Sequence, residues 1–497
     1  MTIDSTPAAS GTPPGKSVQD YLDETPRWAD ATPVDYAPIT RMQWLIWTLA
    51  AAGKLFEGVV VFMTGVALPL MAQQYGLGAT EKGVIAAASL FGILLGASVL
   101  GDLADRYGRK QMFIVEMVLF VCFIVLLTFS WSYPVIVIAL VGIGIALGAD
   151  YPTAHLMISE SMPSRIRGRM VLSAFGFQAV GGLAGTALGF LILFENPDVS
   201  AWRWMYASTI VLAVPVIIGR FFVVQSPSWL VFQGRIEEAE AEIGRLLKRE
   251  PRYPKVVVLP RPHARLQPHP RQKAPWLALF SDANRNRTML ASIPWFLQDL
   301  STYGIGIFTP TILATLIGAQ INHPRNTAEL IQSDVLATKG AALIDVLLIV
   351  GMVFAVLLAD RVGRIGLQLF GFVGCAVGLL LAAFSLKTDG TTTTVLLFAG
   401  FMVFSFMTNI GPNAMTYLIA GEVFPISIRG AGAGFAASFA KIGAVLTAFL
   451  FPILLKDIGT FTLLLILVGT SLLGAVVTWA YAFETKGISL EKMDHLS

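Results

Sequence analysis

Long apolar segments alternate with short polar loops along almost the whole chain. Each segment has roughly the 20 mostly apolar residues that an α-helix needs to cross a bilayer. Six segments precede residue 225 and six follow residue 288. The pattern predicts an all-α polytopic membrane protein with twelve transmembrane helices, at 42–71, 83–101, 112–130, 133–159, 170–194, 205–224, 289–317, 340–359, 366–386, 395–420, 430–455 and 460–483.

The composition agrees with a membrane protein and excludes one large soluble domain. Of the 497 residues, 55% are hydrophobic and 13% are charged, whereas soluble globular chains carry about 25% charged residues. The mean hydropathy is +0.69. Cys122 and Cys375 both lie inside apolar segments, so they indicate neither a disulfide framework nor a metal site.

Polar stretches divide the chain into five parts. Residues 1–41 are rich in Pro and Thr and lack the apolar core of a cleavable signal, so we expect a flexible cytoplasmic tail. Two six-helix halves follow, at 42–224 and 289–483. The linker between them, 225–288, begins with helical amphipathic spacing that predicts short helices, and residues 484–497 form a second cytoplasmic tail.

Positive charge is concentrated on one side of the predicted helices. The 225–288 linker has 12 Lys and Arg against 6 Asp and Glu, a net charge of +6. The short loops 102–110, 164–169 and 360–364 are also basic, whereas the opposite loops are nearly neutral. Because basic loops remain in the cytoplasm, this pattern predicts a multi-pass inner (plasma) membrane protein with both termini cytoplasmic.

Two loop motifs occur twice, in the same order. "ESMPSRIRG" begins at residue 160 and "EVFPISIRG" at residue 422, whereas Asp-Arg-x-Gly-Arg begins at 105 and again at 360. The duplication predicts two pseudo-symmetric halves related by a parallel repeat, an architecture that transporters use to rock around a central site. We expect the loop charges to stabilise one state of that motion: Asp105, Arg106, Arg109, Glu160, Arg167, Asp360, Arg361, Arg364, Glu422 and Arg429.

These motifs resemble those of the major facilitator superfamily. "GDLADRYGRK" looks like its loop between the second and third helices, and "QSPSWLVFQGRIEEA" resembles the sugar-porter branch. Three segments are similar to the phosphate:proton symporters within that branch: "GADYPTAHLMISESMPSRIRGRM", "WFLQDLSTYG" and "NIGPNAMTYLIAGEVFPISIRGAGAGFAASFAKIGA". The resemblance covers nearly all of the chain beyond residue 42 and implies transport by alternating access.

Ionisable residues inside the predicted helices are candidates for function, because burying them in a membrane is costly. Lys54 and Glu57 lie three residues apart and share a helix face. Trp295, Asp299 and Tyr303 form a stripe at spacing of four. Asp299 is a carboxylate in a mostly apolar helix, so desolvation favours its proton-bound form.

The resemblance adds further candidates for the site. It implies that Asp150 and Tyr151 contact the substrate, with Asp150 tied to proton coupling, and that Gln178, Asn413 and Lys441 line the same site. Together with the stripe, the predicted substrate-binding residues are Asp150, Tyr151, Gln178, Trp295, Asp299, Tyr303, Asn413 and Lys441. The predicted proton-coupling residues are Glu57, Asp150, His155 and Asp299.

Two departures from the phosphate symporters bear on coupling. The sequence has Leu140 where that group has an arginine, ten residues before the aspartate, and its first helix offers only Glu57 in place of an Asp-rich phrase. Coupling must then be arranged differently, with Lys54 or His155 as substitutes. Glu116 is expected to pair with an arginine of a loop.

The preferred function is proton-coupled symport of phosphate or a small organic anion. The alternatives are a proton-coupled transporter of sugars or other organic solutes, an exporter of drugs or metabolites, and, more remotely, a transporter-like sensor. An enzyme is not expected. Transport driven by ATP is not expected either, because no phosphate-binding Gly-rich loop with Lys-Ser/Thr is present. We expect no metal, cofactor or nucleic-acid partner, and a protein that works as a monomer in the lipid bilayer.

Overall fold

The computed structural model describes residues 16–24, 39–99, 107–248, 257–259, 275–320, 327–425 and 428–486, and their regular secondary structure is helical. The N-terminal half contains α2 (Arg41–Tyr75), α3 (Ala79–Val99), α5 (Arg109–Thr128), α6 (Tyr133–Ser159), α7 (Ser164–Phe175), α8 (Phe177–Glu195) and α9 (Ala201–Phe222). The C-terminal half contains α13 (Arg285–Gln320), α14 (Thr327–Val362), α15 (Arg364–Ser385), α16 (Thr391–Ile410), α17 (Pro412–Glu422) and α18 (Arg429–Ala480).

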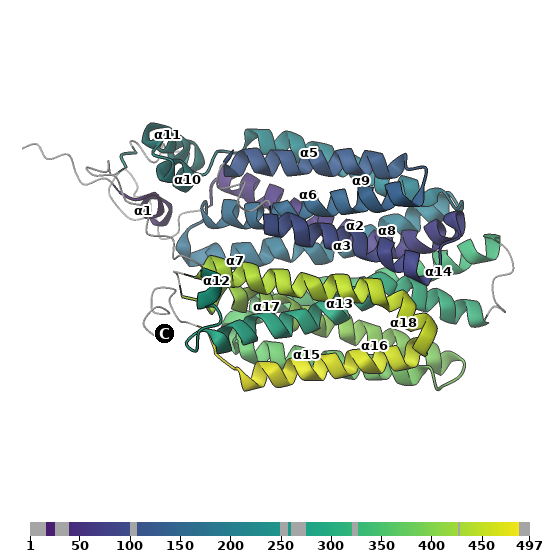
Figure 1. Cartoon of the computed structure of the whole chain (residues 1–497). Coiled ribbons are helices and arrows are strands. Elements are labelled where there is room, and N and C mark those ends of the chain that lie inside the picture. The colour runs from purple at the N-terminus through teal and green to yellow at the C-terminus, as the bar shows by residue number, and fades with distance from the viewer. Residues whose placement is uncertain are drawn as a thin grey trace, which may run out of the picture.

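The helices give twelve membrane crossings. Ten helical segments of the described chain are long and apolar enough to cross a membrane, with α7 and α8 forming one segment and α16 and α17 another. α18 folds back at Gly459, where φ is +75°, so it crosses twice (Figure 1). α13, a 36-residue helix packed along α18, is the remaining crossing. The predicted all-α fold with twelve transmembrane helices is therefore confirmed.

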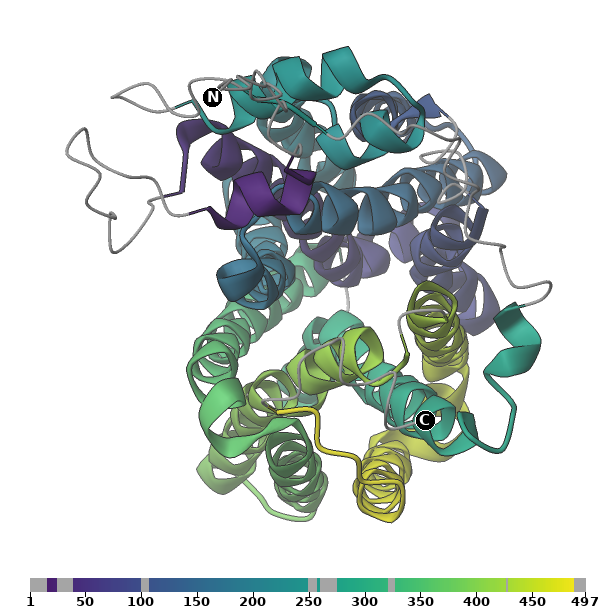
Figure 2. The ribbon, with the colours of Figure 1, turned by 90° about the vertical axis from the view of Figure 1, so that its left-hand side faces the viewer.

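The two ends of the helical bundle carry different elements. α2 begins and α18 ends at the end of the bundle that carries α10 (Pro227–Phe232), α11 (Ile236–Leu246) and α12 (Pro275–Ala278), as Figures 1 and 2 show. We call this the linker end and the opposite one the far end. A further short helix, α1 (Val18–Asp23), lies in the range expected to be a flexible tail. It departs from that expectation because its Tyr21 is buried and accepts a hydrogen bond from the Val258 amide at 2.9 Å.

The two halves meet through equivalent helices, as a pseudo-twofold arrangement requires. α3, the second crossing of the first half, packs against α18, which supplies the fifth crossing of the second half. In the same way α14, the second crossing of the second half, packs against α8, the fifth of the first. The first crossings, α2 and α13, pack against each other. We call the surface formed by these three contacts the seam.

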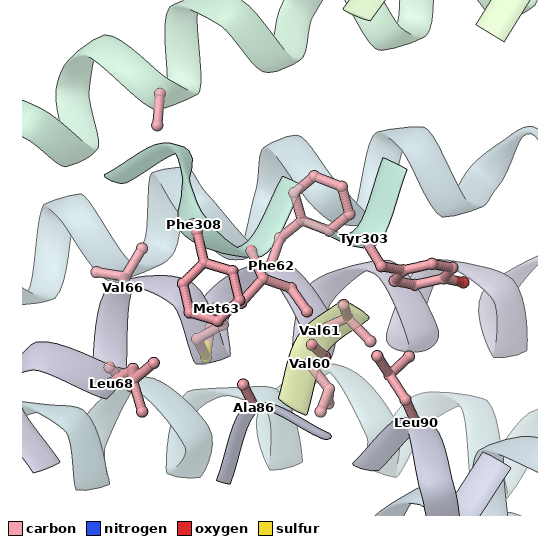
Figure 3. Close-up of a cluster of buried hydrophobic side chains, with 14 of the residues drawn as sticks. Val60, Val61, Phe62, Met63, Val66, Leu68, Ala86, Leu90, Tyr303 and Phe308 are labelled. Atoms are coloured by element: carbon pink, nitrogen blue, oxygen red, sulfur yellow. The ribbon is translucent and has the colours of Figure 1, made fainter. Parts of the chain in front are cut away.

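The seam is closed at the far end by close approach of backbones. A Cβ atom on Gly65 of α2 would lie 2.1 Å from the carbonyl oxygen of Ile307, and one on Gly83 of α3 would lie 2.3 Å from that of Phe449. Apolar side chains fill the space around these contacts, so one hydrophobic core continues across the seam. Figure 3 shows part of this core, where Phe62 of α2 lies beside α13.

Replacing Gly65 by Ala tests the importance of this contact. The added methyl group has no room against the Ile307 carbonyl, and overpacking of a close-packed interior costs about 1–3 kcal/mol. We expect a lower midpoint of thermal unfolding in detergent. Gly434→Ala is the matched control, since nothing lies within 4 Å of a Cβ there. Equal midpoints for both variants would show that the far-end contact is not a tight one.

Candidate functional site

Polar side chains of both halves form one buried cluster at the seam. Glu57 of α2 accepts hydrogen bonds from Lys54 Nζ at 2.6 Å and from Gln178 Nε2 at 3.2 Å. From the other half, Tyr303 OH donates to Glu57 Oε1 at 3.4 Å. Lys441 Nζ lies 3.6 Å from the same Glu57 oxygen and 2.5 Å from Tyr303 OH. Charged hydrogen bonds therefore connect the two halves directly.

Asp299 completes the cluster from α13. Its side chain is 2% exposed, and its Oδ2 lies 3.5 Å from Lys441 Nζ without a hydrogen-bond partner. Lys54 and Lys441 then face the two carboxylates of Glu57 and Asp299, so the cluster is neutral when all four are charged. Protonation of Asp299 leaves one positive charge in excess and frees Lys441 from one of its two anionic neighbours. Proton binding and the contacts across the seam are thereby linked.

A pocket lies on the linker-end side of this cluster. Six of the eight predicted substrate-binding residues line it: Gln178, Trp295, Asp299, Tyr303, Asn413 and Lys441. Glu57 and Phe175 add to its wall, and small or apolar side chains of α3 and α18 complete it. Of the other two predicted residues, Asp150 lies elsewhere, and the side chain of Tyr151 is outside the described part of the structure.

The wall of the pocket in the C-terminal half includes Asn413, and further uncharged polar side chains that do not line the pocket hydrogen-bond to it. Gln298 Nε2 donates to Asn413 Oδ1 at 3.2 Å and to Thr302 Oγ1 at 2.8 Å. Asn413 Nδ2 donates to Asn409 Oδ1 at 2.5 Å, and Asn409 Nδ2 donates to the Leu348 carbonyl at 3.0 Å. Side-chain amides and hydroxyls both donate and accept hydrogen bonds, so this wall suits a solute with hydroxyl groups. Sequence analysis singled out Asn413 and missed Gln298, although an intramembrane glutamine was a visible signal.

Asp150 belongs to a separate buried triad inside the N-terminal half. Arg220 of α9 donates to Asp150 Oδ1 at 2.6 Å and to Glu116 Oε1 at 2.9 Å, and its side chain is fully buried. The same guanidinium donates to the carbonyls of Phe113 and Leu49. Sequence analysis missed Arg220, whose place inside an apolar segment was the available signal. The expectation that Glu116 pairs with a loop arginine is wrong, because Arg220 approaches it within the helical bundle.

The triad touches the central cluster through α2. Asp150 Oδ2 lies 1.5 Å from the position that a Cβ atom on Gly53 would take, next in sequence to Lys54. Only a glycine leaves room for the carboxylate there. The arginine beside Asp150 is Arg220, because α9 packs beside α5 and α2, and the expected role of Lys54 or His155 in its place stays a prediction.

The repeated loop motifs form matching clusters at the linker end of each half. Arg109 NH2 lies 3.6 Å from Glu160, whose Oε2 accepts from Ser226 Oγ at 2.5 Å. In the second half Arg364 Nε lies 3.1 Å from Glu422, whose Oε2 accepts from Thr485 Oγ1 at 2.6 Å. Sequence analysis did not identify Ser226 and Thr485 as equivalent residues of the repeat, because the sequences around them differ.

A left-handed glycine begins the helix in both clusters. Gly108 has φ +104° and Gly363 has φ +102°. Side chains that follow the sixth and twelfth crossings then accept from the first helical amides: Gln225 from Lys110, and Glu484 from Arg364. Each cluster lies within one half. It therefore fixes helix ends inside that half.

The other predicted gating residues have different positions. Arg167 donates to Gln19 of α1 at 2.7 Å. The side chain of Arg361 is exposed, and its backbone carbonyl accepts a hydrogen bond from Lys486 Nζ. Asp105 and Arg106 lie outside the described residues, as do the side chains of Asp360 and Arg429.

An aromatic layer separates the pocket from the linker end. Tyr417 of α17 stacks on Phe175 at 4.4 Å between ring centroids and lies edge-on to Trp295 at 6.2 Å. His155 Nδ1 of α6 lies 2.9 Å from Tyr417 OH, so it joins the halves at this level. His155 was predicted to carry protons, and the structure places it at this contact, apart from the carboxylates of the central cluster.

Comparison with known proteins agrees with this architecture. The family described as "Sugar (and other) transporter" matches residues 47–496. The inner membrane metabolite transport protein YgcS of Escherichia coli is 30% identical over 92% of this chain and 95% of its own, and the major myo-inositol transporter IolT of Bacillus subtilis is 29% identical over 89% and 91%. A structure of the proton:xylose symporter XylE is similar in fold, with a TM-score of 0.71 at 20% identity over 92% of this chain and 99% of its own.

The comparisons correct one part of the sequence analysis. The predicted similarity to the sugar-porter branch is confirmed, but the predicted closeness to phosphate:proton symporters is not supported, because the matched family and these relatives are sugar or metabolite transporters. Short motifs of α6, α13 and α17 suggested phosphate.

Arg220→Leu tests the buried triad. The substitution leaves Asp150 and Glu116 without their guanidinium, and breaking a buried ion pair costs about 3–5 kcal/mol. We expect a large fall in the thermal unfolding midpoint, whereas Arg361→Leu at an exposed position leaves it unchanged. Adding Asp150→Asn and Glu116→Gln to Arg220→Leu should restore part of the loss. If the triple variant is as unstable as Arg220→Leu alone, the loss comes from packing and not from charge.

Proposed function

We propose that this chain, which belongs to the sugar (and other) transporter family, couples proton movement to transport of a small hydroxyl-rich metabolite such as a sugar or polyol. The observation that carries the proposal is the pocket between the halves. In it, the buried carboxylates of Glu57 and Asp299 lie beside uncharged hydrogen-bonding groups of Gln178 and Asn413. The carboxylates are suited to binding protons and the amides to hydrogen-bonding hydroxyl groups, and both sets lie at the seam.

The polar wall supports the choice of solute. Amides of Gln178 and Asn413 present both donors and acceptors, as the hydroxyl groups of a sugar do, and Trp295 offers an apolar face for the ring. A site built to hydrogen-bond hydroxyl groups discriminates strongly against solutes that lack them. The printed names of relatives that carry xylose or myo-inositol agree with this chemistry.

The cross-seam cluster supports coupling to protons. Lys441 bridges Asp299 of its own half and Glu57 of the other. A proton on Asp299 removes one of these attractions, and a bound solute competes for the hydrogen bonds that Gln178 makes to Glu57 and Tyr303. The proton therefore redistributes the contacts of Lys441 between its own half and Glu57 of the other. The solute weakens the hydrogen bond between Gln178 and Tyr303 across the seam, so that the loaded protein changes between its two states.

The charge of the loops supports one orientation of the protein in the membrane. Basic loops lie at the linker end, so we place this end in the cytoplasm. The membrane potential then contributes about 2.3 kcal/mol per charge per 100 mV toward proton entry. The Arg109–Glu160 and Arg364–Glu422 clusters keep each half rigid as it moves, because each of them joins helices of one half.

Uptake into liposomes tests the proposed function. Purified protein is reconstituted with an inward proton gradient and offered labelled xylose or myo-inositol, with labelled phosphate and small organic acids as the contrasting solutes. We expect accumulation of a hydroxyl-rich solute that a protonophore abolishes. Accumulation of phosphate or an organic acid alone would instead identify Lys441 as an anion site and overturn the proposed solute class.

Asp299→Asn tests the coupling residue. The amide imitates the protonated acid in shape and charge but cannot release a proton. We expect gradient-driven accumulation to be lost, whereas exchange of labelled for unlabelled solute at equal pH continues, because exchange requires no net proton transfer. Asp389→Asn, at an exposed loop position, is the control. Normal accumulation by Asp299→Asn at every pH would exclude Asp299 as the coupling site.

A further inference from the structure

Asp345 is a buried carboxylate on the seam that the central cluster does not use. It lies on α14, is 6% exposed, and its Oδ2 is 2.7 Å from Thr186 Oγ1 of α8 in the other half. It makes no ion pair with any described residue. A charged carboxylate in such a place would have a single hydroxyl as its described partner, which is a costly arrangement inside a membrane.

The neighbouring helices offer no counter-charge at this level. α16 has no ionisable side chain, and α8 has only Glu195, at its far-end terminus. Lys54 and Glu57 of α2 and Asp299 of α13 already pair within the central cluster, and the arginines of these two helices lie in their first turns, at the linker end. On α14 itself, Lys339 lies six residues away and Arg361 belongs to the linker end. Asp345 therefore depends on Thr186 for its hydrogen bond.

The hydrogen-bond geometry around Thr186 indicates where the proton lies. Its Oγ1 is 3.1 Å from the Gly182 carbonyl, four residues earlier in α8, and 2.7 Å from Asp345 Oδ2. A hydroxyl has one hydrogen to donate and two lone pairs to accept with. All these groups are satisfied if Thr186 donates to Gly182 and a protonated Asp345 donates to Thr186. With Asp345 ionised, the single hydrogen must serve two acceptors.

The duplicated half shows that packing does not require a carboxylate here. The loop motifs that follow α3 and α14 are 255 residues apart, which places Leu90 at the position equivalent to Asp345 (345 − 255 = 90). Leu90 is fully buried in the hydrophobic core that continues across the seam. An apolar side chain thus fills the corresponding place in α3, and the acid at 345 is a feature of one seam contact only.

We propose that Asp345 is a second proton-binding site, which holds its proton while α8 and α14 are in contact and releases it to water when they separate. The site is distinct from the central cluster and takes no solute. Its coupling to transport rests on the proposed function, whereas its protonation in the closed seam does not. The consequence is that movement of the halves at this contact is itself linked to pH, with acid favouring the closed contact.

Infrared spectroscopy of the full chain in lipid at neutral pH tests the protonation directly and needs no solute. A protonated carboxylic acid has a C=O stretching band that carboxylates lack. We expect that band to be lost from the spectrum of Asp345→Asn, and to move to higher frequency in Thr186→Val, which removes the hydrogen-bond partner. Asp389→Asn, at an exposed loop position, should leave the acid region unchanged.

The possible outcomes separate this inference from the proposed function. If Asp345→Asn removes only carboxylate bands at neutral pH, Asp345 is ionised in the closed seam and the proposal is overturned. An unshifted acid band in Thr186→Val would also contradict it, because the band would then come from another acid. Failure of solute uptake in liposomes leaves the expected spectra unchanged, so the two proposals fail independently.

Discussion

A charge inside a membrane protein must find its partner within the protein, because the surrounding lipid offers none. In this chain that constraint organises the interior. Lys54, Glu57, Asp299 and Lys441 satisfy one another where the halves meet. Arg220 compensates two carboxylates within one half. Because these partners come from distant parts of the chain, pairing fixes which helices lie together as well as neutralising charge.

The location of each charge pair decides what it is able to do. The triad of Glu116, Asp150 and Arg220 lies inside one half, so its contacts persist when the halves move relative to each other. The central cluster crosses the seam, so the same movement alters its contacts. Gly53 lets Asp150 pack directly against α2 beside Lys54. The buried triad and the central cluster are therefore in contact through two adjacent residues of α2, Gly53 and Lys54.

Some structural features occur in both halves, whereas the polar groups of the pocket and the central cluster do not. The linker-end clusters repeat in detail, from the left-handed glycine to the hydroxyl that donates to Glu160 or Glu422. The seam contacts repeat as well, α3 with α18 and α14 with α8. The groups suited to binding a solute or protons do not repeat. The clusters at the linker end and the helix pairs of the seam therefore recur in both halves, whereas the buried triad and the chemical groups of the seam do not.

The sequence by itself determined the fold class, the two halves and much of the pocket. Segment length and loop charge depend on local composition, and the stripe of Trp295, Asp299 and Tyr303 follows from helical spacing alone, so these features were visible without coordinates. Resemblance to a family added Gln178, Asn413 and Lys441, which line the same pocket.

Only the tertiary structure decided which charges meet. Asp150 and Arg220 are 70 residues apart, and Thr186 and Asp345 are 159 apart. Spacing along one helix carries no information about a partner on another helix. Which side chains become neighbours depends on how helices pack and turn about their axes, and on where a glycine such as Gly53 leaves room for a carboxylate. That is why the sequence pointed to Asp150 as a substrate ligand and the packing placed it beside an arginine.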